Sequence, residues 1–141
     1  MLNVTEIADE VRELTAWQET PMPLFEGDYV KMVKRALRQF FVDINHPTEF
    51  DSTLFITGDD GTVYYDGDFI ADEIFYLTIL CKIEFFQRVQ TDVNNRFSYS
   101  TNAMKVSNAD KPYANLKDTL GDLQHDRRIY FNKMVRYTLG T

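Results

Sequence analysis

Residues 74–86 read Ile-Phe-Tyr-Leu-Thr-Ile-Leu-Cys-Lys-Ile-Glu-Phe-Phe, and this apolar stretch decides the fold. At 3.6 residues per turn, a helix with so few polar positions has apolar side chains on nearly all of its sides. Such a helix is usually central, because other elements have to cover it on several sides. We therefore expect a helix that begins near Asp68 and runs to about Val93, where Asn94-Asn95 ends it.

Two further helices are predicted on the N-terminal side of the central helix. Asn3 and Glu6 have the spacing of a capping box, which places the start of the first helix there. The second helix runs from about Phe25 to Ile44, and the His46-Pro47 step ends it because the residue before a proline avoids the helical conformation. Both segments have apolar residues at helical spacing on one face. The predicted faces are Val4, Ile7, Ala8, Val11 and Leu14 in the first helix, and Tyr29, Val33, Ala36, Leu37, Phe40, Phe41 and Ile44 in the second.

A β-hairpin is predicted between the second helix and the central one. Two segments rich in β-branched and aromatic residues, Thr53–Thr57 and Thr62–Tyr65, flank the sequence Gly58-Asp59-Asp60-Gly61. Asp-Gly between such segments is a strong turn signal. Because an isolated hairpin is only marginally stable, we expect this one to lie on the helices or on another chain.

The C-terminal part is predicted as a polar connector followed by a long helix. The connector, Arg96 to Ala109, is expected to be an extended arm or a short strand pair. The last helix begins near Asp110, with Pro112 in its first turn, and runs to about Tyr137. Arg127 interrupts an otherwise apolar stripe that resembles a coiled-coil seam. The stripe consists of Leu116, Leu120, Leu123, Tyr130, Met134 and Tyr137.

The fold class that follows is mainly α, a small bundle of about four helices with one β-hairpin and an extended connector before a long C-terminal helix. The 141 residues suit one domain with one core, residues 1–141. The 11 Phe and 8 Tyr exceed what a small core usually needs, so some aromatic surface is expected to contact partners. No run approaches the roughly 20 apolar residues that span a bilayer, and the N-terminus lacks the pattern of a signal peptide. We therefore expect a soluble protein.

The residues that could carry chemistry do not form a recognisable catalytic pattern. Cys81 lies in the apolar stretch, where a buried and inert thiol is expected, in keeping with a reducing cytoplasm. His46 and His125 are far apart in sequence and are expected to be structural or solvated. There is no phosphate-binding glycine loop and no zinc-ligand spacing. We expect no catalytic residues, no cofactor and no metal ligands.

Charge is distributed unevenly along the chain, whose net charge is −7. No Lys or Arg occurs between Arg38 and Lys82, while the second helix carries a basic stripe and the final third has seven basic residues from Lys105 onward. The acids of the middle are interpreted mainly as turn residues and helix N-terminal carboxylates, with an acidic binding face or a metal site as alternatives. Three interpretations of the basic stripes stay open: solvated helix faces, head-to-tail self-association, or contact with phosphates. The stripe of the second helix is Lys31, Lys34, Arg35 and Arg38, and the acids are Asp43, Glu49, Asp51, Asp59, Asp60, Asp66, Asp68, Asp72 and Glu73.

The segment Tyr99–Val106, with the step Ala109–Tyr113 into a long charged terminal helix, resembles the head–tail connector proteins of tailed bacteriophages, also called adaptor or head-completion proteins. The order of helices before it is also similar. The resemblance implies a helical structural protein without catalytic residues, made in the cytoplasm of the host bacterium and located in the virion at the head–tail interface. It implies a homo-oligomeric ring, typically of twelve, below the portal protein and next to a second connector or tail-completion protein, with DNA passing through it and no membrane contact. The hairpin Thr53–Tyr65 departs from the plainest form of the family.

Partner-binding residues are therefore sought among exposed cations and in the connector. The candidates for ring or partner contacts are Lys34, Arg38, Tyr99, Met104, Arg127, Arg128 and Arg136. Two other functions compete with a virion connector: a small helical regulatory or inhibitor protein that binds one host protein, and, less favoured, an enzyme with a carboxylate metal site. A ring-forming protein assembles with itself or on a portal, whereas an inhibitor stays monomeric or dimeric. Metal titration followed by calorimetry distinguishes an enzyme with a metal site from the other two functions.

Overall fold

The computed structural model describes residues 1–15, 26–44, 46–100 and 116–139, with side chains for all of these except 26, 92–100, 116 and 135–139. This part contains four α-helices and a small antiparallel sheet, which confirms the prediction of a mainly helical bundle with a β-hairpin. The helices are α1 (Val4–Leu14), α2 (Glu26–Asp43), α3 (Ala71–Ser100) and α5 (Leu116–Leu139), and the other elements are β1 (Leu2–Asn3), β2 (Phe55–Thr57), β3 (Val63–Tyr65) and the short 3-10 helix η1 (Ser52–Leu54).

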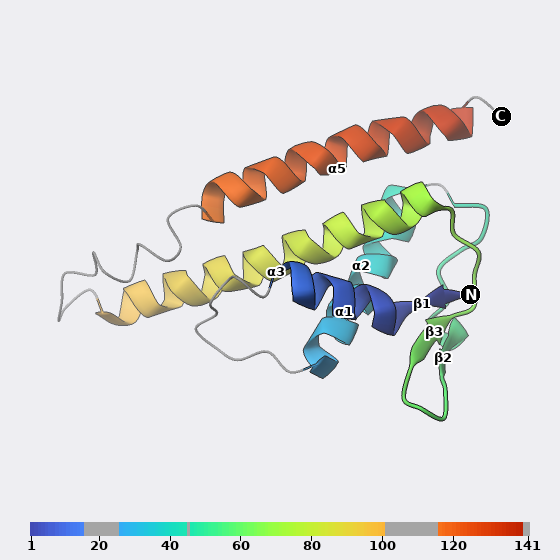
Figure 1. Ribbon diagram of the computed structural model, residues 1–141. Helices are drawn as coiled ribbons and strands as arrows, with labels where there is room; N and C mark the ends of the chain where they lie inside the picture. Colours follow the sequence, from blue (N-terminus) through green and yellow to red (C-terminus); the bar gives the residue numbers. More distant parts are fainter. Residues whose placement is uncertain (16–25, 45, 101–115, 140–141) are drawn as a thin grey trace.

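Helix α3 is the central element, as its apolar sequence predicts. It packs against α1 and α2 on one side, while α5 lies antiparallel along the other side (Figure 1). Most of its apolar residues are buried, and they join residues of α1 and α2 in one hydrophobic core. Among the described side chains of α3, Phe75 is the large apolar one that is exposed: it is 54% exposed and stacks on Tyr130 of α5.

The predicted ends of α3 were wrong. The helix begins at Ala71, three residues after the predicted Asp68, and its N-terminus is capped by the Glu73 carboxylate, which accepts a hydrogen bond from the Ile70 N–H at 2.9 Å. At the other end, Asn94-Asn95 does not stop the helix, which continues to Ser100. Asparagine is only a moderately poor helix former, and no glycine or proline follows it in this stretch, so nothing there forces an end.

The predicted extended connector is therefore shorter than expected, because residues 96–100 belong to α3. The rest of the connector lies outside the described residues, as do Pro112 and the predicted start of the last helix at Asp110. Within the described residues, α5 begins at Leu116 and ends at Leu139, two residues later than predicted. None of the helices in this described part is both long and apolar enough to cross a membrane.

The first two helices largely follow their sequence patterns. The Asn3 side chain accepts a hydrogen bond from the Glu6 N–H at 3.0 Å, which confirms the cap of α1. The prediction that Leu14 is buried was wrong, because its side chain is 44% exposed. Thr15, four residues after Val11, takes the last core position and donates its hydroxyl to the Val11 carbonyl at 2.7 Å. The predicted stripe of α2 is buried or half-buried, and the fully buried Met32 is an addition to it.

The hairpin gains a third strand that the sequence pattern did not predict. Strand β1 pairs with β3, so the sheet order is β1-β3-β2, with Tyr65 opposite both Leu2 and Phe55. The Tyr65 side chain is 1% exposed and lies among phenylalanine rings from the rest of the chain. The hairpin thus lies on its own chain, and its tip extends beyond the helices (Figure 1).

Candidate functional site

One polar cluster joins three helices around Asp43, at the C-terminal end of α2. Its Oδ2 atom accepts hydrogen bonds from the Tyr76 hydroxyl of α3 at 2.6 Å and from Arg127 Nη2 of α5 at 2.5 Å. Its Oδ1 atom accepts one from Gln39 Nε2 at 2.8 Å. Arg127 Nε also donates to the Tyr76 hydroxyl at 3.3 Å. The cluster ties α5 to both of the helices beneath it.

Hydrogen bonding, against the effect of burial, holds Asp43 and Arg127 of this cluster in their charged forms at neutral pH. Burial alone raises the pKa of Asp43, but the hydrogen bonds from Tyr76, Gln39 and Arg127 outweigh burial, so the pKa is lowered below its ordinary 3.8. Burial, followed by the bond to Asp43, raises the pKa of Tyr76 to about 12. The tyrosine therefore stays protonated as a donor and the aspartate stays ionised as an acceptor.

The sequence pattern did not predict this cluster, although one position carried a signal for it. Arg127 occupies a position within the apolar stripe of α5. A charged side chain at such a position in the middle of a helix faces the core, where it is expected to have an oppositely charged partner. Neither Asp43 nor Tyr76 carries a comparable signal, because an acid at the end of an amphipathic helix and a tyrosine in an apolar one are both common. Arg127 remains a candidate for partner contacts, but its guanidinium already has an intramolecular partner.

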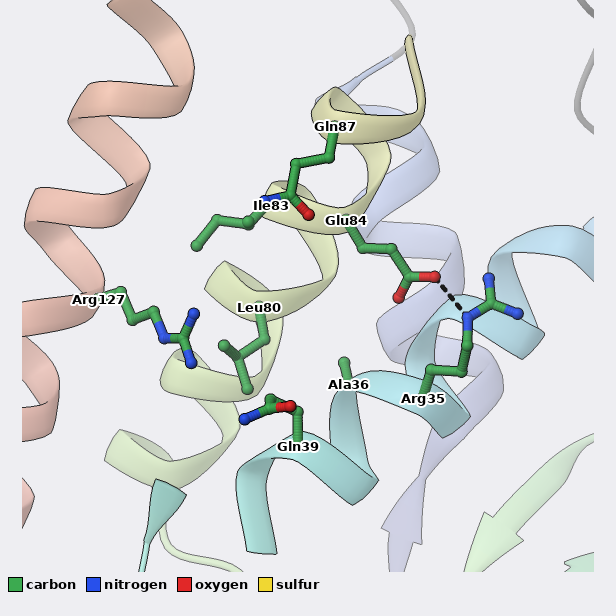
Figure 2. Close-up of a pocket in the computed structure, with 8 residues that line it drawn as sticks. All are labelled: Arg35, Ala36, Gln39, Leu80, Ile83, Glu84, Gln87 and Arg127. Atoms are coloured by element: carbon green, nitrogen blue, oxygen red, sulfur yellow. Dashed lines mark hydrogen bonds and ion pairs between the residues drawn. The ribbon is translucent and has the colours of Figure 1, made fainter. Parts of the chain in front are cut away.

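The Arg127 side chain lines two cavities. The one in Figure 2 has a volume of about 250 Å³ and lies between α2, α3 and α5, with the apolar side chains of Leu80 and Ile83 toward its interior. The ion pair between Arg35 of α2 and Glu84 of α3 lines one side of this cavity, with a distance of 2.5 Å between Arg35 Nε and Glu84 Oε1. The second, about 260 Å³, includes the exposed Arg128. The charged groups of the first cavity are paired with one another or with Asp43, which favours a structural role for it.

A different surface carries two of the predicted contact residues. A groove of about 400 Å³ lies between α2 and the start of the hairpin, and we call it the basic groove. Lys34 Nζ lies 5.1 Å from the ring centre of Phe55, and Arg38 Cζ lies 5.8 Å from that of Phe50. Both distances are in the range of cation–π attraction, so the rings hold the two cations at the groove. Its lining residues are Lys34, Arg35, Arg38, Phe50, Ser52 and Phe55.

The cations of the basic groove differ in how they are paired. Arg35 forms the ion pair with Glu84. Neither Lys34 nor Arg38 has a carboxylate within 4.0 Å in the part of the chain that the structure describes. Asp51, beside the groove in sequence, is engaged by Thr53, whose N–H and hydroxyl donate to Asp51 Oδ1 at 2.9 and 2.7 Å. The groove therefore presents two positive charges and two aromatic rings without an internal counter-ion, a composition suited to an anionic partner.

The other predicted contact residues are only partly placed. Tyr99 lies in the last turns of α3 and Arg136 near the end of α5, but their side chains are not among those described. Met104 lies outside the described residues. Of the predicted set, the structure brings Lys34 and Arg38 together at the basic groove, and the neighbouring Arg127 and Arg128 line the second cavity.

The remaining groups that could carry chemistry have structural surroundings. Cys81 is fully buried, as predicted, and burial raises the pKa of its thiol far above its usual range. His46 is enclosed by aromatic rings, and its Nε2 lies 3.2 Å from the Asp68 carbonyl and 3.7 Å from Glu73 Oε2. His125 is exposed. Among the described residues, no group of three or more His, Cys, Asp or Glu side chains could hold a metal ion. No protein-family model, curated protein or solved structure matches the chain.

Proposed function

We propose that this protein is a structural assembly protein of a tailed bacteriophage, a head–tail connector that forms a ring below the portal and extends the DNA channel toward the tail. The resemblance of Tyr99–Tyr113 and of the helix order to that family is the origin of the proposal. It places the protein in the virion, beside the portal and a second connector or tail-completion protein.

The observation that carries the proposal is the pair of uncompensated cations in the basic groove of a chain with net charge −7. A cationic groove on an acidic molecule is complementary to acidic surface elsewhere on a second copy, and contacts between different surfaces of identical chains are heterologous and close into rings when the rotation allows it. The net negative charge also suits a channel protein, because DNA is held tightly only where basic groups neutralise its phosphates.

Co-assembly with the portal protein of the same genome tests this function. We expect the purified chain to co-sediment with the portal and to form a ring visible by negative-stain electron microscopy. Because surface charge pairs are screened, assembly should weaken as salt rises from low to moderate concentration. Failure to bind the portal at any salt concentration, in a preparation that is folded by circular dichroism, would refute the connector function.

The competing function is that of a small inhibitor that binds one host protein. The basic groove favours this function too, because it could serve as the docking surface for an acidic partner. Mass photometry across a range of protein concentrations separates the two. A connector grows to a ring alone or on the portal, whereas an inhibitor remains monomeric or dimeric in both conditions.

A further inference from the structure

We infer that the basic groove of one copy receives the acidic tip of the hairpin, Gly58–Gly61, from a second copy. This inference rests on the proposed function and deepens it, since it names the two surfaces that would form each contact between neighbouring subunits. The contact is heterologous, because the groove and the tip are different parts of the chain.

The groove has the size and charge for a short acidic loop. Its volume of about 400 Å³ accommodates a few small side chains, and two rings form part of its wall. Lys34 and Arg38 are four residues apart on α2, which puts their side chains on the same face about 5–6 Å apart at Cβ. Both lack a carboxylate partner in the described part of the chain, so binding an anion there breaks no existing ion pair.

The tip is built to present carboxylates outward. The Gly61 N–H bonds the Gly58 carbonyl at 3.0 Å, which makes Asp59 and Asp60 the two central residues of a tight turn. Gly61 has φ +85°, a conformation that glycine adopts without strain. Both aspartates are exposed, and the tip projects from the helices (Figure 1).

The two aspartates of the tip have different roles. The N–H and hydroxyl of Thr62 donate to the Asp60 carboxylate at 3.1 and 2.9 Å, which fixes the turn. These bonds also lower the pKa of Asp60 below its ordinary 3.8. Asp59 has no hydrogen bond or ion pair within the described residues, so it is free to bind a cation of another chain.

Charge and shape favour a second copy over nucleic acid as the occupant. The free Asp59 carboxylate can bind a cation of the groove, and the charge of Asp60, whose carboxylate is held by Thr62, adds to the attraction. The net charge of −7 repels a second copy as well as a polyanion such as DNA, so the preference for a second copy rests on the local match between the acidic tip and the basic groove. Exposed Ile56, next to the turn on β2, supplies apolar surface that docking of the tip would cover.

Intermolecular crosslinking tests the contact directly. One chain carries Ser52→Cys in the groove and another, with a different tag, carries Thr57→Cys at the exposed end of β2, beside the tip, which leaves Asp59 in place; the natural Cys81 is retained because it is buried. We expect disulfide-linked heterodimers when the two are mixed under oxidising buffer. The matched control replaces Thr57→Cys by Glu13→Cys, an exposed position at the end of α1, which lies away from the sheet (Figure 1). A yield no higher than that of this control would overturn the inference.

A charge exchange tests whether the attraction is electrostatic. A groove variant carries Lys34→Glu with Arg38→Glu, and a tip variant carries Asp59→Lys with Asp60→Asn, which keeps an acceptor for Thr62. The affinity of self-association of each variant alone should be lower than that of the original chain by about tenfold or more, because like charges then face each other. An equimolar mixture should associate again, because each tip then meets a groove of opposite charge.

These experiments distinguish failure of the docking inference from failure of the proposed connector function. If the chain binds the portal but the variants assemble as the original does and no crosslink forms, the docking inference fails and the proposed function stands. If the crosslink and the charge exchange succeed but the portal is not bound, the contact stands and the connector function fails. A third outcome would assign the groove to nucleic acid and overturn the inference. In that outcome the original chain binds single-stranded DNA, the groove variant does not, and no crosslink forms between copies.

Discussion

Replacing Arg127 by methionine is the sharpest perturbation of the fold. Methionine keeps the unbranched aliphatic part of the side chain but removes the guanidinium, which bonds Asp43 Oδ2 at 2.5 Å and the Tyr76 hydroxyl at 3.3 Å. The Asp43 carboxylate would then remain ionised and largely enclosed, with only Tyr76 and Gln39 as donors. The variant should fold, because the core packing is retained, but with a lower free energy of unfolding.

The magnitude follows from how deeply the pair is buried. Removing one partner of a fully buried ion pair costs about 3–5 kcal/mol, whereas an exposed pair contributes about 0–1 kcal/mol. The side chains of Arg127 and Asp43 are 28% and 14% exposed, so this pair lies between those limits. We expect a loss of about 2 kcal/mol, which corresponds to a shift of roughly 1 M in the midpoint of urea unfolding.

The pH dependence of this loss has a definite sign. A carboxyl group whose pKa is lower in the folded than in the unfolded chain stabilises the fold above its unfolded pKa, and this stabilisation is lost as the pH falls through the folded value. The pKa of Asp43 lies below its ordinary 3.8 in the original chain. The difference in unfolding free energy between the original chain and Arg127→Met should therefore be full at pH 7 and shrink as the pH falls below about 4.

Urea unfolding followed by circular dichroism at pH 7 and pH 3 measures both quantities. The matched control is Arg128→Met, the adjacent exposed residue on α5, which should change stability by less than about 0.5 kcal/mol. Equal losses for the two variants at pH 7 would refute the claim that Arg127 is a structural partner of Asp43. A loss for Arg127→Met that stays constant down to pH 3 would refute the electrostatic explanation.

Three further predictions concern other parts of the chain. Cys81→Ala should fold with a loss of about 1 kcal/mol, and the native thiol should react only slowly with a water-soluble reagent; rapid labelling would contradict its burial. Asn3→Ala should lower the free energy of unfolding by about 1 kcal/mol, because the Glu6 N–H loses its cap, and a thermal midpoint unchanged from the original would show that the cap contributes nothing. Asp59→Asn should leave the thermal midpoint unchanged with and without calcium, since a tight site would produce a shift by ligand linkage; a calcium-dependent rise of several degrees in the original chain, absent from the variant, would reveal a metal site at the turn.

The sequence by itself determined the elements that depend on local patterns. The apolar run of residues 74–86 required a covered helix, and α3 is central and covered. The Asn3–Glu6 spacing placed the start of α1, because a cap is made within one turn of the chain. The Asp-Gly signal located the hairpin turn, because that conformation depends on the turn residues themselves. Cys81 was expected in the core for the same reason as its neighbours.

Only the tertiary structure decided which distant residues meet. Pairing of β1 with β3 joins residues more than 60 positions apart, and a two-residue strand carries no periodic signal of its own. The end of α3 could not be placed from Asn94-Asn95, because a modest local preference is easily overridden by the rest of the helix. The basic stripe of α2 likewise showed cations on one face, but not which of them had partners. In the folded chain Arg35 forms an ion pair with Glu84, whereas Lys34 and Arg38 lie beside aromatic rings. These pairings depend on contacts between distant parts of the chain, which the periodicity of one helix does not encode.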